Sequence, residues 1–173
     1  VTALARLTGT HQSGRLSPEV GVLFPYDAAE AASAMPLLMA GEAEVRAKAR
    51  AIADFIAQCP TLFPANLRTA DFAARLEEDG VRLFLHDAAI RRFLFSDPQM
   101  IALAHWNTHI DNAWFWRDDR GTLQAGLLDW GMVRQMNVAM ALWGGLSGGD
   151  LSLWAGHADA LIALFRQEHL AAG

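Results

Sequence analysis

The residue types best suited to chemistry gather in one stretch in the second half of the chain. His105, Asn107, His109 and Asn112 follow one another at short spacing, and Asp129 comes after an aromatic segment and a glycine turn. The order of loop, strand, turn, strand and acidic loop is typical of a metal–nucleotide site for phosphoryl transfer. That reaction asks a protein for positioning and charge stabilisation more than for covalent chemistry.

A predicted β-hairpin would position two of these side chains. Residues 113–117 (AWFWR) are short and aromatic, residues 118–121 (DDRG) form a turn signal, and residues 122–128 (TLQAGLL) alternate in pattern. A hairpin with its ends at Asn112 and Asp129 brings an amide oxygen and a carboxylate side by side. Mg²⁺ takes oxygen ligands, usually one or two from protein with phosphates completing the shell. The alternative is that Asn112 is a turn residue and Asp129 caps the hairpin end.

This stretch resembles the catalytic loop and metal loop of the aminoglycoside phosphotransferase and choline kinase family, including its ecdysteroid-kinase-like branch. The family pattern is roughly HGDxHxxN, then a strand pair, then (I/L)D(W/F)(G/Q). The catalytic-loop-like segment is 105–112 and the metal-loop-like segment is 129–131 (DWG). Within the first segment His105, His109 and Asn112 match the pattern.

The resemblance implies a fold, a reaction and roles for residues. The fold would be mainly α with a small β-hairpin, the C-terminal lobe of a protein-kinase-like phosphotransferase. The activity would be ATP-dependent transfer to a small-molecule hydroxyl substrate. Asn112 and Asp129 would bind Mg²⁺, and His105 and His109 would support the loop by hydrogen bonds.

Several positions depart from the family pattern. Asn107 stands in the place of the catalytic aspartate and Trp106 in the place of a glycine. An amide can orient a hydroxyl but cannot take its proton at neutral pH. Asp111 is a possible substitute base, or it caps the turn. Downstream, Asn137 and Ala141 replace two further acidic residues of the family. The alternative function is therefore a non-catalytic, pseudokinase-like binding or structural domain.

Other patterns have simpler interpretations. The spacing of His105 and His109 would also suit zinc, but a zinc site needs a third ligand and a helical or ribbon context. We interpret the remaining histidines as surface residues or as core residues with hydrogen-bond partners. We also interpret the six tryptophans as core rather than as ligand-stacking residues.

The composition indicates one domain over residues 1–173. The net charge of −5 argues against a nucleic-acid surface, because such a surface needs clustered Lys and Arg. Cys59 is the only cysteine, so we expect no internal disulfide and a cytoplasmic location. No run of about 18 apolar residues is present, so we expect no membrane partner.

Helical periodicity covers most of the remaining chain. We predict helices at about 2–12, 42–58, 67–79, 82–95, 136–144 and 151–170. Residues 13–41 read as irregular, with a short Ala-rich helix between Pro25 and Pro36. The glycine pairs at 144–145 and 148–149 are expected to separate the last two helices.

The family's N-terminal nucleotide lobe is expected to be absent. No Gly-rich phosphate loop and no strand with a nucleotide-binding lysine precedes residue 1. Apolar surface that such a lobe would cover should then be exposed. We expect it to be relieved by self-association or by the missing lobe as a partner.

Overall fold

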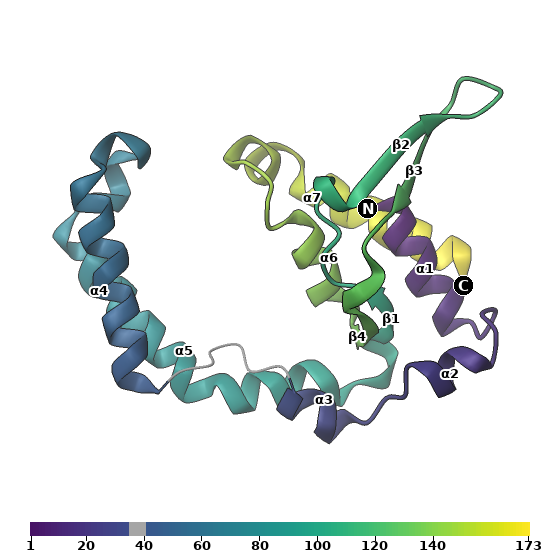
Figure 1. Ribbon diagram of the computed structural model, residues 1–173, viewed down its shortest axis with the longest axis horizontal. Coiled ribbons are helices and arrows are strands. Elements are labelled where there is room, and N and C mark those ends of the chain that lie inside the picture. Colours follow the sequence, from purple (N-terminus) through teal and green to yellow (C-terminus); the bar gives the residue numbers. More distant parts are fainter. Residues whose placement is uncertain (35–40) are drawn as a thin grey trace. The chain divides into compact units, whose positions relative to one another are not determined.

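The computed structural model describes residues 1–34 and 41–173, and over these residues it is mainly helical with two small antiparallel sheets (Figure 1). By their contacts, the residues group into two compact units, Val1–Ala31 with Phe95–Gly173, and Ala32–Leu94. The single domain that we expected over residues 1–173 stays a prediction.

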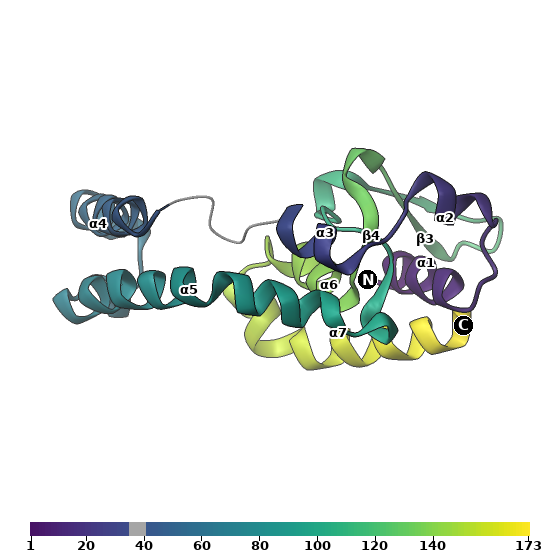
Figure 2. The ribbon, with the colours of Figure 1, turned by 90° about the horizontal axis from the view of Figure 1, so that it is seen from below.

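Two helices frame the first unit. Helix α1 (Thr2–Gln12) and helix α7 (Leu151–Ala172) lie side by side in both views (Figures 1 and 2). Gly9 allows this close approach, because a Cβ there would collide with the carbonyl oxygen of His169. Leu4 from α1 and Phe165 from α7 are buried. Both helices were predicted, and both predictions are confirmed.

Two nested strand pairs form the β part of this unit. Strand β1 (Ile101–His105) pairs antiparallel with β4 (Val133–Asn137). Strand β2 (Ala113–Arg117) pairs antiparallel with β3 (Leu123–Leu127), which confirms the predicted hairpin. His105 pairs with Val133, so the segments that follow β1 and precede β4 leave the same end of that pair. The topology therefore brings the two predicted loops together.

The pair β1–β4 itself was not predicted. Strand β1 is buried at every position, and a short, fully buried strand carries no alternation of polar and apolar residues. Residues 136 and 137 belong to β4, so the predicted helix start at 136 was two residues early. Helix α6 (Val138–Leu146) begins where the Asn137 side chain accepts a hydrogen bond from the Ala139 amide, 2.9 Å away. Of the two glycine pairs predicted to separate the last helices, Gly148 and Gly149 do lie between α6 and α7, whereas Gly144 and Gly145 lie inside α6.

The second unit contains two long helices. Helix α4 (Glu42–Gln58) matches its predicted bounds and buries Val45, Ala49 and Ile56, whereas Ile52 is half-exposed. Helix α5 (Ala70–Ser96) is continuous, so the helical character predicted at 67–79 and 82–95 is confirmed and the predicted break between the two helices is wrong. Gly80, inside α5, faces α4: a Cβ on it would lie 3.2 Å from Val45. A glycine inside a helix can thus mark close packing.

Ion pairs join the polar faces of α4 and α5. Glu77 accepts hydrogen bonds from Arg50 and Arg46, each at 3.1 Å. The hydrogen bonds from Arg50 and then Arg46 lower the pKa of Glu77 to about 2. Because the three side chains are partly in water, this network contributes little to stability.

Short helices complete the described residues. Helix α3 (Ala28–Ala34) agrees with the predicted Ala-rich helix, of which residue 35 lies outside the described residues. Helix α2 (Glu19–Leu23) lies in a segment that we had taken as irregular. Single 3₁₀ turns occur at Pro60–Leu62, Ala65–Leu67, Pro98–Met100, Ile110–Asn112 and Trp130–Met132. Over the described part of the chain, no helix is long and apolar enough to cross a bilayer.

Candidate functional site

His105 ties the two predicted loops together. It ends strand β1, is fully buried, and places its Nε2 2.7 Å from the carbonyl oxygen of Leu128. A carbonyl only accepts, so Nε2 donates and carries the ring proton. Trp130 packs its ring edge-on against the imidazole, with centroids 5.2 Å apart. The Nδ1 of His105 is buried without a hydrogen-bond partner among the described residues.

Asn112 connects the loop after β1 to the hairpin. Its side-chain Nδ2 donates a 2.9 Å hydrogen bond to the backbone carbonyl oxygen of Asn107. Its own carbonyl oxygen accepts a 2.8 Å hydrogen bond from the Leu128 amide, which extends the ladder of the hairpin by one rung. Asn112 is half-buried and held at both its backbone and its side chain. It is therefore more than the simple turn residue of the alternative interpretation.

Asp129 comes directly after Leu128, the residue whose amide bonds to Asn112. Its backbone is left-handed, with φ 56° and ψ 63°, and among the described residues it is the one non-glycine with positive φ. Such a conformation costs about 1–2 kcal/mol and tends to occur at functional sites. The carboxylate is exposed and makes no hydrogen bond or ion pair with the described residues. Asp129 stands at the N-cap position of the following 3₁₀ turn, but its side chain makes no capping hydrogen bond there.

The donor set of Asn112 and Asp129 fits a magnesium ion. The amide nitrogen of Asn112 is engaged with Asn107, which leaves the side-chain oxygen as the atom available to a cation. Asp129 adds a carboxylate oxygen that nothing else in the described chain binds. One amide and one carboxylate oxygen suit Mg²⁺, which takes its other ligands from water and phosphates. Across the described residues, no three His, Cys, Asp or Glu side chains are grouped for a metal.

Helix α6 presses against the loop between β1 and the hairpin. A Cβ on Gly144 would collide with the carbonyl oxygen of Trp106, and one on Gly145 would collide with the Thr108 hydroxyl. Farther along, a Cβ on Gly148 would lie 2.9 Å from the Nδ1 of His109. The loop thus rests on a helix face without side chains. Our sequence interpretation missed this role, although the closely spaced glycines were the signal for it.

The two positions at which the resemblance implied acidic residues, 137 and 141, have structural roles. Asn137 caps α6, and Ala141 is fully buried inside the unit. Backbone contact with Gly144 and Gly145, rather than a carboxylate at position 141, therefore supports the loop. His109 is half-buried, and its carbonyl oxygen accepts a 3.0 Å hydrogen bond from the Asn112 amide.

The tryptophans are mostly not core, which corrects our expectation. Trp106 is half-buried, and the other five are exposed: Trp114, Trp116, Trp130, Trp143 and Trp154. Trp114 and Trp116 stack on one another along β2, with ring centroids 4.6 Å apart. The indole of Trp114 lies over Gly126 of β3, where a Cβ would collide with it. The strands were predicted from these residues, but their small sheet leaves the rings uncovered.

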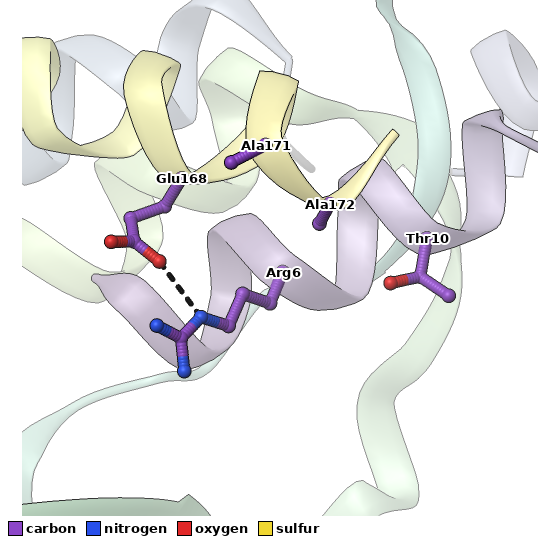
Figure 3. A pocket seen from close by; sticks show the side chains of 5 residues that line it. All are labelled: Arg6, Thr10, Glu168, Ala171 and Ala172. Atoms are coloured by element: carbon purple, nitrogen blue, oxygen red, sulfur yellow. Dashed lines mark hydrogen bonds and ion pairs between the residues drawn. The ribbon is translucent and has the colours of Figure 1, made fainter.

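A cavity lies away from these loops. It has a volume of about 400 Å³ and is lined by Arg6, Thr10, Glu168, Ala171 and Ala172 of α1 and α7 (Figure 3). Figure 3 shows the ion pair of Arg6 and Glu168, 2.7 Å long, crossing its side. The cavity is open to solvent, and the predicted site residues are absent from its lining. We place the candidate chemistry at the loops that carry Asn112 and Asp129, and not at this cavity.

Searches of protein-family models, curated proteins and solved structures for proteins similar to this chain found no match.

Proposed function

We propose that residues 105–131 form the phosphate- and metal-binding part of an ATP-dependent small-molecule phosphotransferase, built as the C-terminal lobe of a kinase-like fold. The observation that carries the proposal is the clamp between Asn112 and Asn107. This hydrogen bond directs the Asn112 side-chain oxygen away from Asn107. The backbone of Asn112 is in turn bonded to Leu128, the residue that precedes Asp129. Asn112 and Asp129 thus supply oxygen donors from two loops that the hairpin ladder joins through Leu128.

Three further features support the proposal. His105 joins the two loops through the Leu128 carbonyl, as the resemblance implies for a loop-supporting histidine. Asp129 holds a strained backbone and an unengaged carboxylate, and no structural role in the described chain accounts for either. A Mg²⁺ ion held by Asn112 and Asp129 would neutralise phosphate charge, which is a large part of what phosphoryl transfer requires.

The presence of an amide at position 107 favours slow phosphoryl transfer, or nucleotide binding without transfer, over efficient catalysis. The amide of Asn107 can orient an acceptor hydroxyl but cannot take the proton. General-base catalysis contributes about 10²–10⁴-fold, so its loss need not abolish transfer. Binding without transfer, as in a pseudokinase, is the second candidate function and rests on this one substitution. A cytosolic location remains our proposal for the compartment, because Cys59 is the single cysteine.

Calorimetric titration with Mg²⁺ and a nucleotide tests the proposal. Titrations should reach millimolar nucleotide, because the affinity of one lobe should be poor. Asp129→Ala should weaken binding strongly, and Asn112→Ala less, since a neutral carbonyl attracts the cation less than a carboxylate does. Asn107→Asp should leave binding nearly intact and raise any transfer rate, because it restores a base.

Two outcomes separate the candidates. Magnesium-dependent binding with transfer only in Asn107→Asp would favour the pseudokinase. Absence of magnesium-dependent nucleotide binding in the wild type, also after a nucleotide lobe is supplied, would reject both the metal site and the kinase proposal.

A further inference from the structure

His169 of α7 lies between two polar side chains of α1. Its Nδ1 is 2.8 Å from the hydroxyl oxygen of Thr8, and its Nε2 is 2.9 Å from the Oε1 of Gln12. Thr8 is fully buried, and His169 is half-buried. These contacts lie at the long junction of α1 and α7 that Figure 2 shows from below. Each ring nitrogen of His169 therefore has one defined partner.

Gln12 fixes the proton on one of those nitrogens. Its Nε2 donates to two carbonyl oxygens, those of Gln99 at 2.8 Å and Ile101 at 2.9 Å. An amide nitrogen has two protons, and both are used by these acceptors. Rotating the amide would set its oxygen against two carbonyl oxygens. The Oε1 of Gln12 therefore accepts from His169, and Nε2 of His169 carries a proton whether the ring is neutral or charged.

Thr8 can satisfy the other nitrogen in either protonation state. Its hydroxyl oxygen lies 2.9 Å from the carbonyl oxygen of Ala5 as well as 2.8 Å from Nδ1 of His169. With a neutral ring, the hydroxyl donates to Nδ1. With a charged ring, Nδ1 donates to the hydroxyl oxygen, and the hydroxyl proton turns to Ala5. Only a hydroxyl, which both donates and accepts, allows both arrangements.

The order Thr8, His169, Gln12 resembles a nucleophile, a base and an orienting group. Full burial of Thr8 excludes that role, because no substrate can reach its oxygen. The other charged and titratable groups on α1, α7 and β1 are Arg6, His11, His157, Asp159, Arg166, Glu168 and His105, and Arg15 and Asp97 lie just outside these elements. Arg6 and Glu168 pair with one another at 2.7 Å. Neither ring nitrogen of His169 bonds to a charged group. The hydrogen-bond partners of a protonated His169 ring are therefore the neutral side chains of Thr8 and Gln12.

We infer that the Thr8 hydroxyl is a two-position rotor that lets His169 gain a proton while both ring nitrogens stay hydrogen-bonded. Through Gln12, the same histidine joins α7 to the start of β1, the strand that ends at His105. The rotor would keep α1, α7 and β1 joined as the medium becomes acidic. This inference does not rest on the proposed phosphotransferase activity.

The sign of the pH effect follows from burial. Burial lowers the pKa of His169 below its ordinary value of 6.5. The unfolded chain then binds this proton more readily than the folded chain does, so stability falls as the pH drops from 6.5 through the folded pKa. The rotor limits the loss, because the charged ring keeps its bond to Thr8. Without the hydroxyl, the pKa should fall further and the loss should deepen.

Nitrogen-15 NMR of the imidazole rings in the full chain tests the inference directly. In the wild type, Nε2 of His169 should carry a proton at every pH, and Nδ1 should gain one on acidification. Thr8→Val keeps the shape of the side chain and removes the hydroxyl. It should lower the His169 pKa by about half a unit to one unit, because the charge-assisted bond it removes is the stronger one. Thr8→Ser keeps a hydroxyl and should restore the wild-type titration.

Unfolding experiments give the second readout. When the pH falls from about 8 to about 5, the melting temperature of Thr8→Val should decrease by more than that of the wild type or of Thr8→Ser. A neutral His169 in the wild type with its proton on Nδ1 would overturn the inference without any variant. Equal titration of His169 in folded Thr8→Val and wild type would overturn it as well.

Discussion

The side-chain amide of Asn112 donates a 2.9 Å hydrogen bond to the backbone carbonyl oxygen of Asn107, so the last residue of the loop holds the residue five positions before it. The bond closes the loop on itself across five residues. It also leaves one oxygen of Asn112 for a cation. One side chain thus has a structural role through its nitrogen and a proposed binding role through its oxygen.

Asn112→Asp separates these two roles. A carboxylate cannot donate to the Asn107 carbonyl, and its charge would repel that oxygen. We expect a loss of about 1–2 kcal/mol in the free energy of unfolding, measured by denaturant titration. Asn66→Asp is the control, because Asn66 is exposed and makes no side-chain hydrogen bond with the described residues; it should change stability by less than about 0.5 kcal/mol. Equal effects at the two positions would contradict the importance of the clamp.

Gly144 supports the same loop from the side of α6. Gly144→Ala would drive a methyl group into the Trp106 carbonyl, which is backbone and cannot swing away. We expect a loss of about 1–3 kcal/mol in the free energy of unfolding. Gly156→Ala in α7 is the matched control, since a Cβ there meets nothing within 4 Å. It should stabilise the helix by about 0.5–1 kcal/mol. If Gly144→Ala and Gly156→Ala change the free energy of unfolding in the same direction, the contact between Gly144 and Trp106 is not tight.

The hairpin was predictable because its signals are local. The turn at 118–121 and the alternation of 122–128 specify their own structure, and α1, α4 and α7 likewise carry helical periodicity within their own sequences. Strands β1 and β4 depend on each other across about 30 intervening residues, and β1 is buried throughout. A buried short strand has no pattern to distinguish it from a helix segment.

The candidate site was predictable only as a set of residues. The sequence indicated that Asn112 and Asp129 meet at the hairpin ends, and Asn112 does bond to the residue before Asp129. It did not indicate that the Asn112 amide turns toward Asn107, or that Asp129 adopts a left-handed backbone. The loops that carry these residues are held by His105 of β1 and by Gly144 and Gly145 of α6, which the local pattern does not reveal. Gly144 and Gly145, which we had expected to separate two helices, instead contact the loop at Trp106 and Thr108. Residue identity alone does not distinguish a glycine in a turn from a glycine at a site of close packing.

Exposed apolar side chains on the hairpin predict self-association. Phe115 and Leu123 are 51% and 59% exposed and lie on the same face of β2 and β3. Changing both to serine should reduce any assembly seen by light scattering at high protein concentration. Leu62→Ser, at a position 69% exposed in the other unit, is the control and should leave the mass unchanged. A wild type that stays strictly monomeric and binds no apolar dye would count against the prediction.

Asp129 offers a test in which stability and binding should respond differently. Asn adopts the left-handed region readily among residues with a side chain, and it keeps the size of Asp. Asp129→Asn should therefore change the free energy of unfolding by less than about 0.5 kcal/mol. It removes the charge that would attract a cation, so magnesium-dependent nucleotide binding should weaken about tenfold or more. Asp119→Asn, an exposed position in the hairpin turn, loses the same charge and should leave both quantities unchanged. If Asp129→Asn instead lowers stability markedly and leaves binding intact, the carboxylate of Asp129 stabilises the fold and does not bind the metal.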